Sequence, residues 1–493
     1  MCATFATLSH KKSMKKIIGF CFFFILIVQT ITVAQSKKWT LEECVQYALE
    51  NNISIKQTEL DSQLSQIDKS SALGNFLPSF NASASHSWNI GLNQNITTGL
   101  LENQTTQFTS ASLSAGIDIY KGLQNQNRFR RAQLSIIGAQ YQLNKIKDDI
   151  ALNVSNAFLQ ILFNIENLKV QKEQLALNEK QLQRTEELVN SGSLPKGDVL
   201  DSKATVAGDK QRVINAENTL LISKLSLAQL LQLEKFQDFD VAEINNEANQ
   251  SAVMLQTPEA ILEKAKENRM ELKIAKTNVA IAEKDVKIAK GAYQPTIQGF
   301  YSFSTRASYA DRITGIQFDT TNPIVPTGDF VNVGGVDYAV LQPNRSFVFG
   351  KSAPVFDQFS DNKGHNFGVQ MNVPILNGFS ARNTVARNKI SLEKSKIALN
   401  QSELDLERTI YTVYTDAKGA LKAYESAQQA LEARENAFNY AKERYAVGMM
   451  NAFDFNQAQS LFTNAQSEVL RTKYDYIFRT KIVEFYFGIQ IIK

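Results

Sequence analysis

The chain contains the same pattern twice, and this duplication limits its possible folds more than any other feature. The segment TLEECVQYALENNISIK begins at Thr40 and matches TPEAILEKAKENRMELK, which begins at Thr257, an offset of 217 residues. A second block repeats at an offset of 256 residues, which pairs Gly122 with Gly378. Internal repeats of this kind predict two copies of one structural unit.

The two offsets differ by 39 residues, which indicates an insertion in the second copy between Thr305 and His365. Otherwise each copy has the same predicted order. A helix of about 30 residues comes first, beginning at Leu41 in copy one and at Pro258 in copy two. Two strands joined by a loop follow, and then a very long helix, a short turn and another helix.

Apolar residues recur every seven positions along the long helices. Such a repeat imposes left-handed coiled-coil packing. If residues 123–188 are helical throughout, they form a rod about 100 Å long, whereas an ordinary helical-bundle core needs helices of only about 10–20 residues. Copy one has Ile161, Leu168, Leu175, Leu182 and Val189, then Val199, Val206, Val213, Leu220 and Leu227. Copy two has Ala417, Tyr424, Leu431, Phe438 and Tyr445, then Phe455, Phe462, Val469, Tyr476 and Val483.

The predicted strands alternate between apolar and polar residues. In copy one, Phe80, Ala82, Ala84, Trp88, Ile90 and Leu92 share one face, and the partner strand has Leu113, Ala115, Ile117 and Ile119. Copy two has Ile297, Gly299, Tyr301 and Phe303, then Phe367, Val369, Met371, Val373 and Ile375. This alternation is typical of outer-membrane strands, and a half-buried strand in a soluble sheet shows it too.

The N-terminus has the features of a secretory signal peptide. Four lysines precede an apolar run, Ile17–Val28, and small residues end at Ala34. The run is shorter than the about 20 residues that span a membrane. Removing residues 1–34 leaves 49 basic and 49 acidic residues, so the neutral mature chain gives no support for nucleic-acid binding. Cys44 alone of the three cysteines remains, which excludes a disulfide within the mature chain.

A mature chain without a long apolar run can span a membrane only with strands, and open strand edges are not tolerated in lipid. Four strands per chain cannot close a barrel, so several chains must share one. Two chains give eight strands, whose interior side chains nearly fill the barrel. Three chains give twelve strands and room for a conduit, which favours a trimer.

Seven local motifs resemble those of the TolC-like family of outer-membrane efflux and export channels. Together they extend over nearly the whole mature chain, and their order and doubling are specific although each is loose alone. They are WTLEECVQYALENN, LPSF, KGL, VNSGSLPKGDVLDS, GAYQPTIQGFYSF, PILNGFSARN and RYAVGMMNAFDF.

The resemblance implies an α+β membrane protein: a homotrimer with a twelve-stranded β-barrel that continues into a periplasmic helical tunnel. It implies a passive duct in the Gram-negative outer membrane that joins an inner-membrane transporter through a periplasmic adaptor. The expected organisation is a signal peptide (1–34), a first repeat (35–235), a linker in an equatorial belt (236–257) and a second repeat (258–493). The insertion, residues 306–366, becomes an extracellular loop.

Both copies have a glycine followed six residues later by an aspartate, at the turn between the two helices: Gly192 and Asp198, and Gly448 and Asp454. Glycine permits the positive φ that such a turn requires, and the aspartate can cap the next helix. The resemblance implies that these tips form the periplasmic entrance. In a trimer the carboxylates, with Asp201 one turn further, would converge and attract cations. The alternative is that the aspartates only cap their helices.

In copy two the family commonly has a tyrosine before this glycine and two aspartates a helical turn apart, and the family's archetype has a basic residue in the turn. Tyr445 and Asp454 match, whereas Gln457 and Met450 replace the second aspartate and the basic residue. We therefore expect a gate without a full ionic latch. The candidate gate residues are Asp198, Asp201, Tyr445, Asp454 and Gln457, with packing by Met449 and Met450.

The exposed apolar tips are also candidate contacts for an adaptor, although the same residues could serve only to pack the turns. These tip residues are Gly192, Ser193, Leu194, Gly448, Met449 and Met450.

Catalysis is not expected, and neither is a cofactor or a metal. The mature chain has two histidines, His86 and His365, outside any metal-ligand spacing, and it has no glycine-rich phosphate loop. Two other classes of protein remain as alternatives. A non-conducting periplasmic coiled-coil adaptor would explain the heptads but not the two matched hairpins. A trimeric adhesin stalk would place its strands at the C-terminus.

Overall fold

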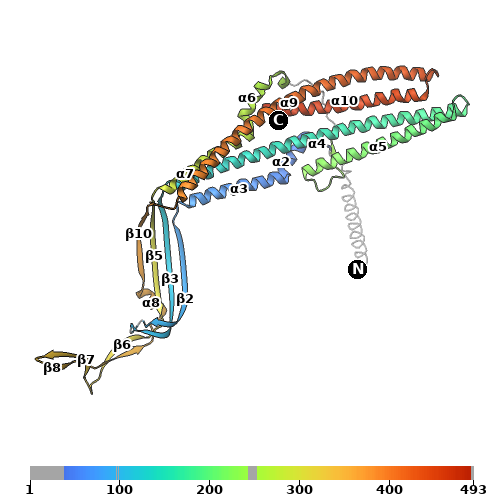
Figure 1. Cartoon of the computed structure of the whole chain (residues 1–493). Coiled ribbons are helices and arrows are strands. Elements are labelled where there is room, and N and C mark those ends of the chain that lie inside the picture. Colours follow the sequence, from blue (N-terminus) through green and yellow to red (C-terminus); the bar gives the residue numbers. More distant parts are fainter. Residues whose placement is uncertain (1–37, 96, 98, 243–251, 490–493) are drawn as a thin grey trace, which may run out of the picture. The chain divides into compact units, whose positions relative to one another are not determined.

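The computed structural model describes residues 38–95, 97, 99–242 and 252–489. The predicted signal peptide and the middle of the predicted linker therefore lie outside the described residues. The elements follow the predicted order in both copies (Figure 1). Copy one comprises β1 (Lys38–Trp39), α2 (Leu41–Asn51), α3 (Ile53–Gly74), β2 (Ser79–Gln94), β3 (Leu101–Lys121), α4 (Gln124–Asn190) and α5 (Lys196–Leu231). The strand β4 (Asp240–Val241) lies in the predicted linker and pairs with β1.

Copy two repeats these elements, and its long helices have the same lengths as those of copy one. The helices α4 and α9 each have 67 residues, and α5 and α10 each have 36. Copy two comprises η1 (Ala252–Leu255), α6 (Pro258–Asn268), α7 (Met270–Lys290), η2 (Gly291–Tyr293), β5 (Thr296–Ser308), β10 (Gly364–Asn372), α9 (Ser380–Ala446) and α10 (Ala452–Phe487).

The first helix of each copy is broken, so the prediction of one helix of about 30 residues is wrong. The breaks occur at Asn52 and Arg269, which correspond at the offset of 217 and both have extended backbone. Asn52 ends α2 because its side chain bonds the backbone at the start of α3 and the backbone of α5. Its Oδ1 accepts the N–H of Ser54 at 2.9 Å, and its Nδ2 donates to the carbonyl of Leu230 at 3.1 Å.

Contacts divide the chain into two compact units. Among the described residues, one contains residues 38–62, 138–242, 252–276 and 398–489, and the other contains residues from 63 to 137 and from 277 to 397. The first unit has two larger apolar cores, one for each copy, and a small third cluster near the copy-two turn. The copy-one core includes Cys44, Ala48, Phe158, Ile161 and Leu227, and the copy-two core includes Ile261, Ala265, Ile410, Ala417 and Val483.

The second unit contains one antiparallel sheet of four strands in the order β10-β5-β3-β2 (Figure 1). Its register confirms the two predicted faces. Phe80, Ala115, Tyr301 and Phe367 lie level with one another, and the adjacent polar row is Asn81, Ser114, Ser302 and Asn366. The last strand ends at Asn372, so the predicted extension to Ile375 is wrong; Pro374, which has no N–H to donate, follows closely.

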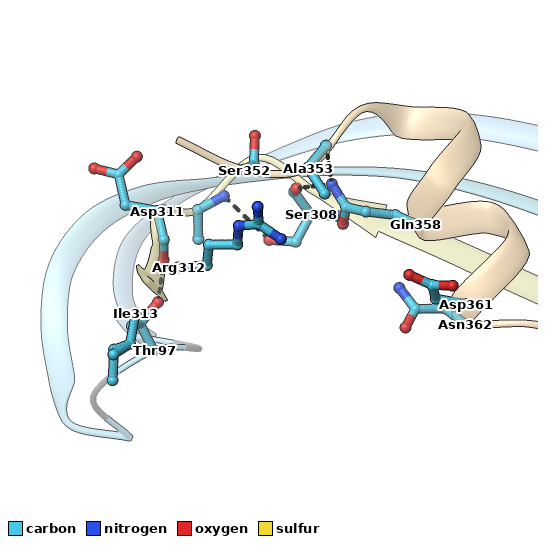
Figure 2. A pocket seen from close by; sticks show the side chains of 11 residues that line it. Thr97, Ser308, Asp311, Arg312, Ile313, Ser352, Ala353, Gln358, Asp361 and Asn362 are labelled. Atoms are coloured by element: carbon cyan, nitrogen blue, oxygen red, sulfur yellow. Dashed lines mark hydrogen bonds between the residues drawn. The ribbon is translucent and has the colours of Figure 1, made fainter. Parts of the chain in front are cut away.

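The insertion forms strands and a short helix rather than an irregular loop. β6 (Arg312–Phe318) pairs with β9 (Arg345–Gly350), and β7 (Ile324–Val333) pairs with β8 (Val336–Pro343). The helix α8 (Val355–Asp361) packs against the end of β5. Figure 2 shows the side chain of Gln358 against Ser308, whose N–H and carbonyl it bonds, both at 2.9 Å. A polar hollow of about 400 Å³ lies beside this contact.

None of the helices within the described residues is long and apolar enough to cross a membrane.

Candidate functional site

The two turns that join the long helices have the same geometry. Gly192 and Gly448 have φ values of +78° and +74°. In copy one, Ser193 N–H donates to Leu188 at 2.8 Å, and Gly192 N–H donates to Val189 at 3.0 Å. Copy two repeats this pair of bonds, which is the Schellman motif with glycine at the left-handed position. Both glycines therefore have the positive φ that was predicted.

The two aspartates lie in the first turn of the second helix, but neither is its N-cap residue. The N-cap of α10 is Asn451, whose Oδ1 accepts the N–H of Asp454 at 2.8 Å. Asn451 also donates from Nδ2 to the Asp454 carboxylate at 3.0 Å. The corresponding position in copy one is Pro195, which makes no side-chain cap bond. Neither aspartate is therefore an N-cap as predicted, because each lies three residues after the N-cap position. Their place in the first turn agrees with the predicted interaction with the helix dipole.

The exposure of the tip residues divides them into two groups. Leu194 and Met450 are half-buried, and Asp198 is half-buried as well. Met449 is 72% exposed, so only Met450 packs against the aromatic cluster of this turn. The exposed group comprises Ser193, Asp201, Met449, Asp454 and Gln457.

Tyr445 connects the copy-two turn to copy one. Its ring stacks on Phe455 with centroids 4.6 Å apart, within a cluster that includes Phe438 and Phe462. Its hydroxyl accepts a hydrogen bond of 3.0 Å from Nε2 of Gln181 in α4. Of the predicted gate residues, Tyr445 is the one with a side-chain bond between the two copies.

Sequence reasoning missed a row of amide side chains that continues from Gln181 along α4. Its members are spaced three and four residues apart, as on one face of a helix. The four central members bond hydroxyl and amide groups of α10: Gln459 donates to Asn178 at 2.8 Å, and Thr463 donates to Gln174 at 2.6 Å. The row, here called the α4 amide row, is Asn164, Asn167, Gln171, Gln174, Asn178 and Gln181. The spacing of these amides is present in the sequence, but a search for apolar residues every seven positions does not detect polar ones.

The centre of the α4 amide row is a buried network. Asn178 is 5% exposed, Gln459 is 1% exposed and Asp209 is 1% exposed. Asn178 donates to the Asp209 carboxylate, which also accepts from Arg212. The network is satisfied except at Oε1 of Gln459, which is buried without a hydrogen-bond partner among the described residues. Bonds between buried amides and carboxylates favour one register of the helices that carry them.

A second buried polar group lies at the break between α6 and α7. The Arg269 guanidinium is 5% exposed, donates to Glu271 at 2.9 Å and lies 4.1 Å from the ring centroid of Phe485. Burial would raise the pKa of Glu271, but its bonds from Arg269 hold that pKa below its ordinary value. Burial raises the pKa of Asp148, and the charge of Arg269 opposes this only in part.

The described residues contain no group of three or more side chains suited to hold a metal ion. Both histidines are bonded within the sheet. His86 lies 2.7 Å from the hydroxyl of Thr109, and His365 lies 2.9 Å from that of Tyr301.

Known proteins resemble the chain over nearly its whole length. A family model described as outer membrane efflux protein matches residues 44–232 and 261–479. The outer membrane protein TolC of Vibrio cholerae is 24% identical over 404 residues, which covers 78% of each chain. The structure of VceC from Vibrio cholerae has a TM-score of 0.71 at 14% identity and covers 92% of this chain and 96% of VceC. The CmeC outer membrane channel of Campylobacter jejuni has a TM-score of 0.65 at 16% identity, with coverages of 91% and 85%. These two structures show likeness of fold.

Proposed function

This chain belongs to the outer membrane efflux protein family, and we propose that three copies of it form a passive exit duct with its entrance at the two tip turns. The family places the protein in the outer membrane of a Gram-negative cell and makes it an efflux channel, which confirms the resemblance seen in the sequence. The trimer, the conduit and the partners described below are part of the proposal.

The observation that carries the proposal is the four-stranded sheet with one apolar and one polar face. Its outer strands, β10 and β2, have no further strand beside them within the described residues. An open edge of this kind is not tolerated in lipid, and three such sheets would close one barrel of twelve strands. The polar rows would face the conduit, and the apolar rows would face lipid.

The tip turns support the second half of the proposal. Asp198 and Asp454 occupy the same place in both copies, so a trimer would bring six carboxylates to one end of the helices. Clustered carboxylates attract cations. The exposed Met449 is a contact for a periplasmic adaptor, which would link the duct to an inner-membrane transporter.

Conductance of the purified protein in a planar bilayer tests the duct. We expect discrete, cation-preferring current steps that multivalent cations block from the side of the tips. The Asp454→Ala variant should lose part of this block, because it removes three of the six carboxylates. A protein that gives no current steps would contradict the proposal.

Membrane fractionation tests the alternative, a periplasmic adaptor that does not conduct. An adaptor would leave the outer-membrane fraction on mild extraction, whereas an integral trimer would remain. Release of the whole protein by a carbonate wash would favour the adaptor.

A further inference from the structure

The end of copy one packs closely against the start of copy two. In this contact Nε of Arg131 in α4 lies 2.6 Å from Oδ1 of Asp285 in α7. Nearby, the backbone of Gly122 meets that of Gly291, and a Cβ added at either glycine would collide with the other residue. These contacts join β3 and α4 to α7 and β5 within one chain.

The duplication supplies a second set of the same four residues. At the offset of 256, Arg387 and Gly378 in copy two are equivalent to Arg131 and Gly122 in copy one. At the offset of 217, Asp68 and Gly74 in copy one are equivalent to Asp285 and Gly291 in copy two. All four residue types are retained. Yet Asp68 is exposed whereas its equivalent, Asp285, is half-buried, and a Cβ at Gly74 or Gly378 would meet nothing within 4 Å. The single protomer gives no reason for a glycine at position 74, where φ is not positive.

We propose that α9 and β10 of one subunit pack against α3 and β2 of the next subunit, as α4 and β3 pack against α7 and β5 within the chain. Arg387 then pairs with Asp68 of the partner subunit, and Gly378 packs on Gly74 of the partner subunit. This inference rests on the trimer proposed above and specifies its subunit contact.

The same two offsets determine the strand register across the contact. Within the chain, Ser114 of β3 lies opposite Ser302 of β5. The equivalent pair is Gln370 of β10 and Ser85 of the partner subunit, both on the polar face. A slip of one residue would set polar side chains beside apolar ones. On the apolar face this register places Phe367 opposite Trp88 of the partner subunit, and these side chains are 77% and 60% exposed in the protomer.

Exposed apolar side chains on α3 and α9 agree with this contact. Leu64 in α3 is 58% exposed, whereas its equivalent in α7, Ile281, is half-buried. Ile390 in α9 is 60% exposed, whereas its equivalent in α4, Leu134, is half-buried. The two exposed residues, Leu64 and Ile390, are therefore the ones that the proposed contact with the next subunit would bury.

Exchange of the charges tests the helical part of the contact. Arg387→Asp and Asp68→Arg should each lower by several degrees the temperature at which the detergent-solubilised trimer dissociates, because each places like charges together. The double variant should recover most of the loss. Lys389→Asp is the matched control, since Lys389 is exposed and its equivalent, Gln133, is exposed even where the contact is present within the chain.

Disulfide formation tests the strand register. Gln370→Cys combined with Ser85→Cys should give covalent dimers and trimers on a denaturing gel after mild oxidation. Gln370→Cys combined with Ser83→Cys or with Ser87→Cys should give far less, because diagonal neighbours lie about 7–8 Å apart, beyond the usual reach of a disulfide. Cys44 is buried and does not compete.

The outcomes separate this inference from the proposed function. Preferred cross-linking at position 85 together with rescue by the double charge exchange supports the contact. Preferred cross-linking at position 83 or 87 overturns the proposed contact. Trimers of the single charge variants that are as stable as that of Lys389→Asp overturn it as well. In either case the duct remains supported if the wild-type trimer conducts. A wild-type protein that is monomeric and non-conducting overturns the duct itself.

Discussion

The side-chain amide of Gln181 donates a 3.0 Å hydrogen bond to the hydroxyl of Tyr445, which joins α4 of copy one to the end of α9 in copy two. The tyrosine ring is held at the same time by its stack on Phe455. One residue therefore links the tip turn to the helix of the other copy, through a bond that can break without loss of the stacked ring.

Tyr445→Phe should raise the frequency of open-channel events about fivefold, because a typical hydrogen bond contributes about 1 kcal/mol. Single-channel recording measures this frequency. Tyr440→Phe is the control, because Tyr440 is 71% exposed on the same helix. Equal opening frequencies in the two variants would remove Tyr445 from the gate.

The Gln181–Tyr445 bond also shows what the sequence could reveal of this site. The doubled Gly–Asp spacing located both turns, and the tyrosine stood out because it precedes Gly448. Its partner was not predictable, because Gln181 and Tyr445 are 264 residues apart and their contact depends on how two long helices pack. Asparagine and aspartate are both preferred N-caps, so the sequence alone does not decide between Asn451 and Asp454, three residues later.

The fold was more predictable than the site, because repeated lengths and alternation are local properties. The breaks at Asn52 and Arg269 were missed, since neither residue is a helix breaker by type. Asn52 ends its helix through a bond to Leu230, far away in the sequence. The strands of the insertion were missed because its glycines and prolines favour loops, whereas Gly334 and Gly335 in fact turn the chain between β7 and β8 with positive φ.

Asn178→Ala should lower the free energy of unfolding by about 2–3 kcal/mol, because it leaves Gln459 and Asp209 buried with one bond fewer each. Thermal unfolding followed by circular dichroism measures the loss. Glu179→Ala is the control. Its side chain is half-exposed and pairs with Lys210 on the surface, so we expect a change below about 0.5 kcal/mol. Similar values for both variants would show that the α4 amide row adds little stability.

Two glycine substitutions near the copy-one turn should have opposite effects. Gly192→Ala should cost about 1–2 kcal/mol, because φ is +78° there and an L side chain is strained in that region. Gly197→Ala should stabilise by about 0.5–1 kcal/mol, because Gly197 lies in the first turn of α5 with nothing within 4 Å of an added Cβ. Chemical denaturation of both variants measures the difference, and a shared sign would contradict the turn geometry.

Asp148→Asn should raise the thermal unfolding midpoint at pH 7 by about 1 °C. Burial raises the pKa of Asp148 above its ordinary value of 3.8, so the contribution of this carboxyl group to stability is present below pH 3.8 and is lost as the pH rises through the folded-state pKa. The neutral amide avoids that loss, and its advantage should therefore disappear in acid. Asp149→Asn is the control, because the neighbouring carboxylate pairs with Lys145 at 2.6 Å and its removal gives no gain. Unfolding midpoints measured from pH 3 to pH 7 check the sign, and a gain that persists undiminished at pH 3 would show that ionisation of Asp148 is not its cause.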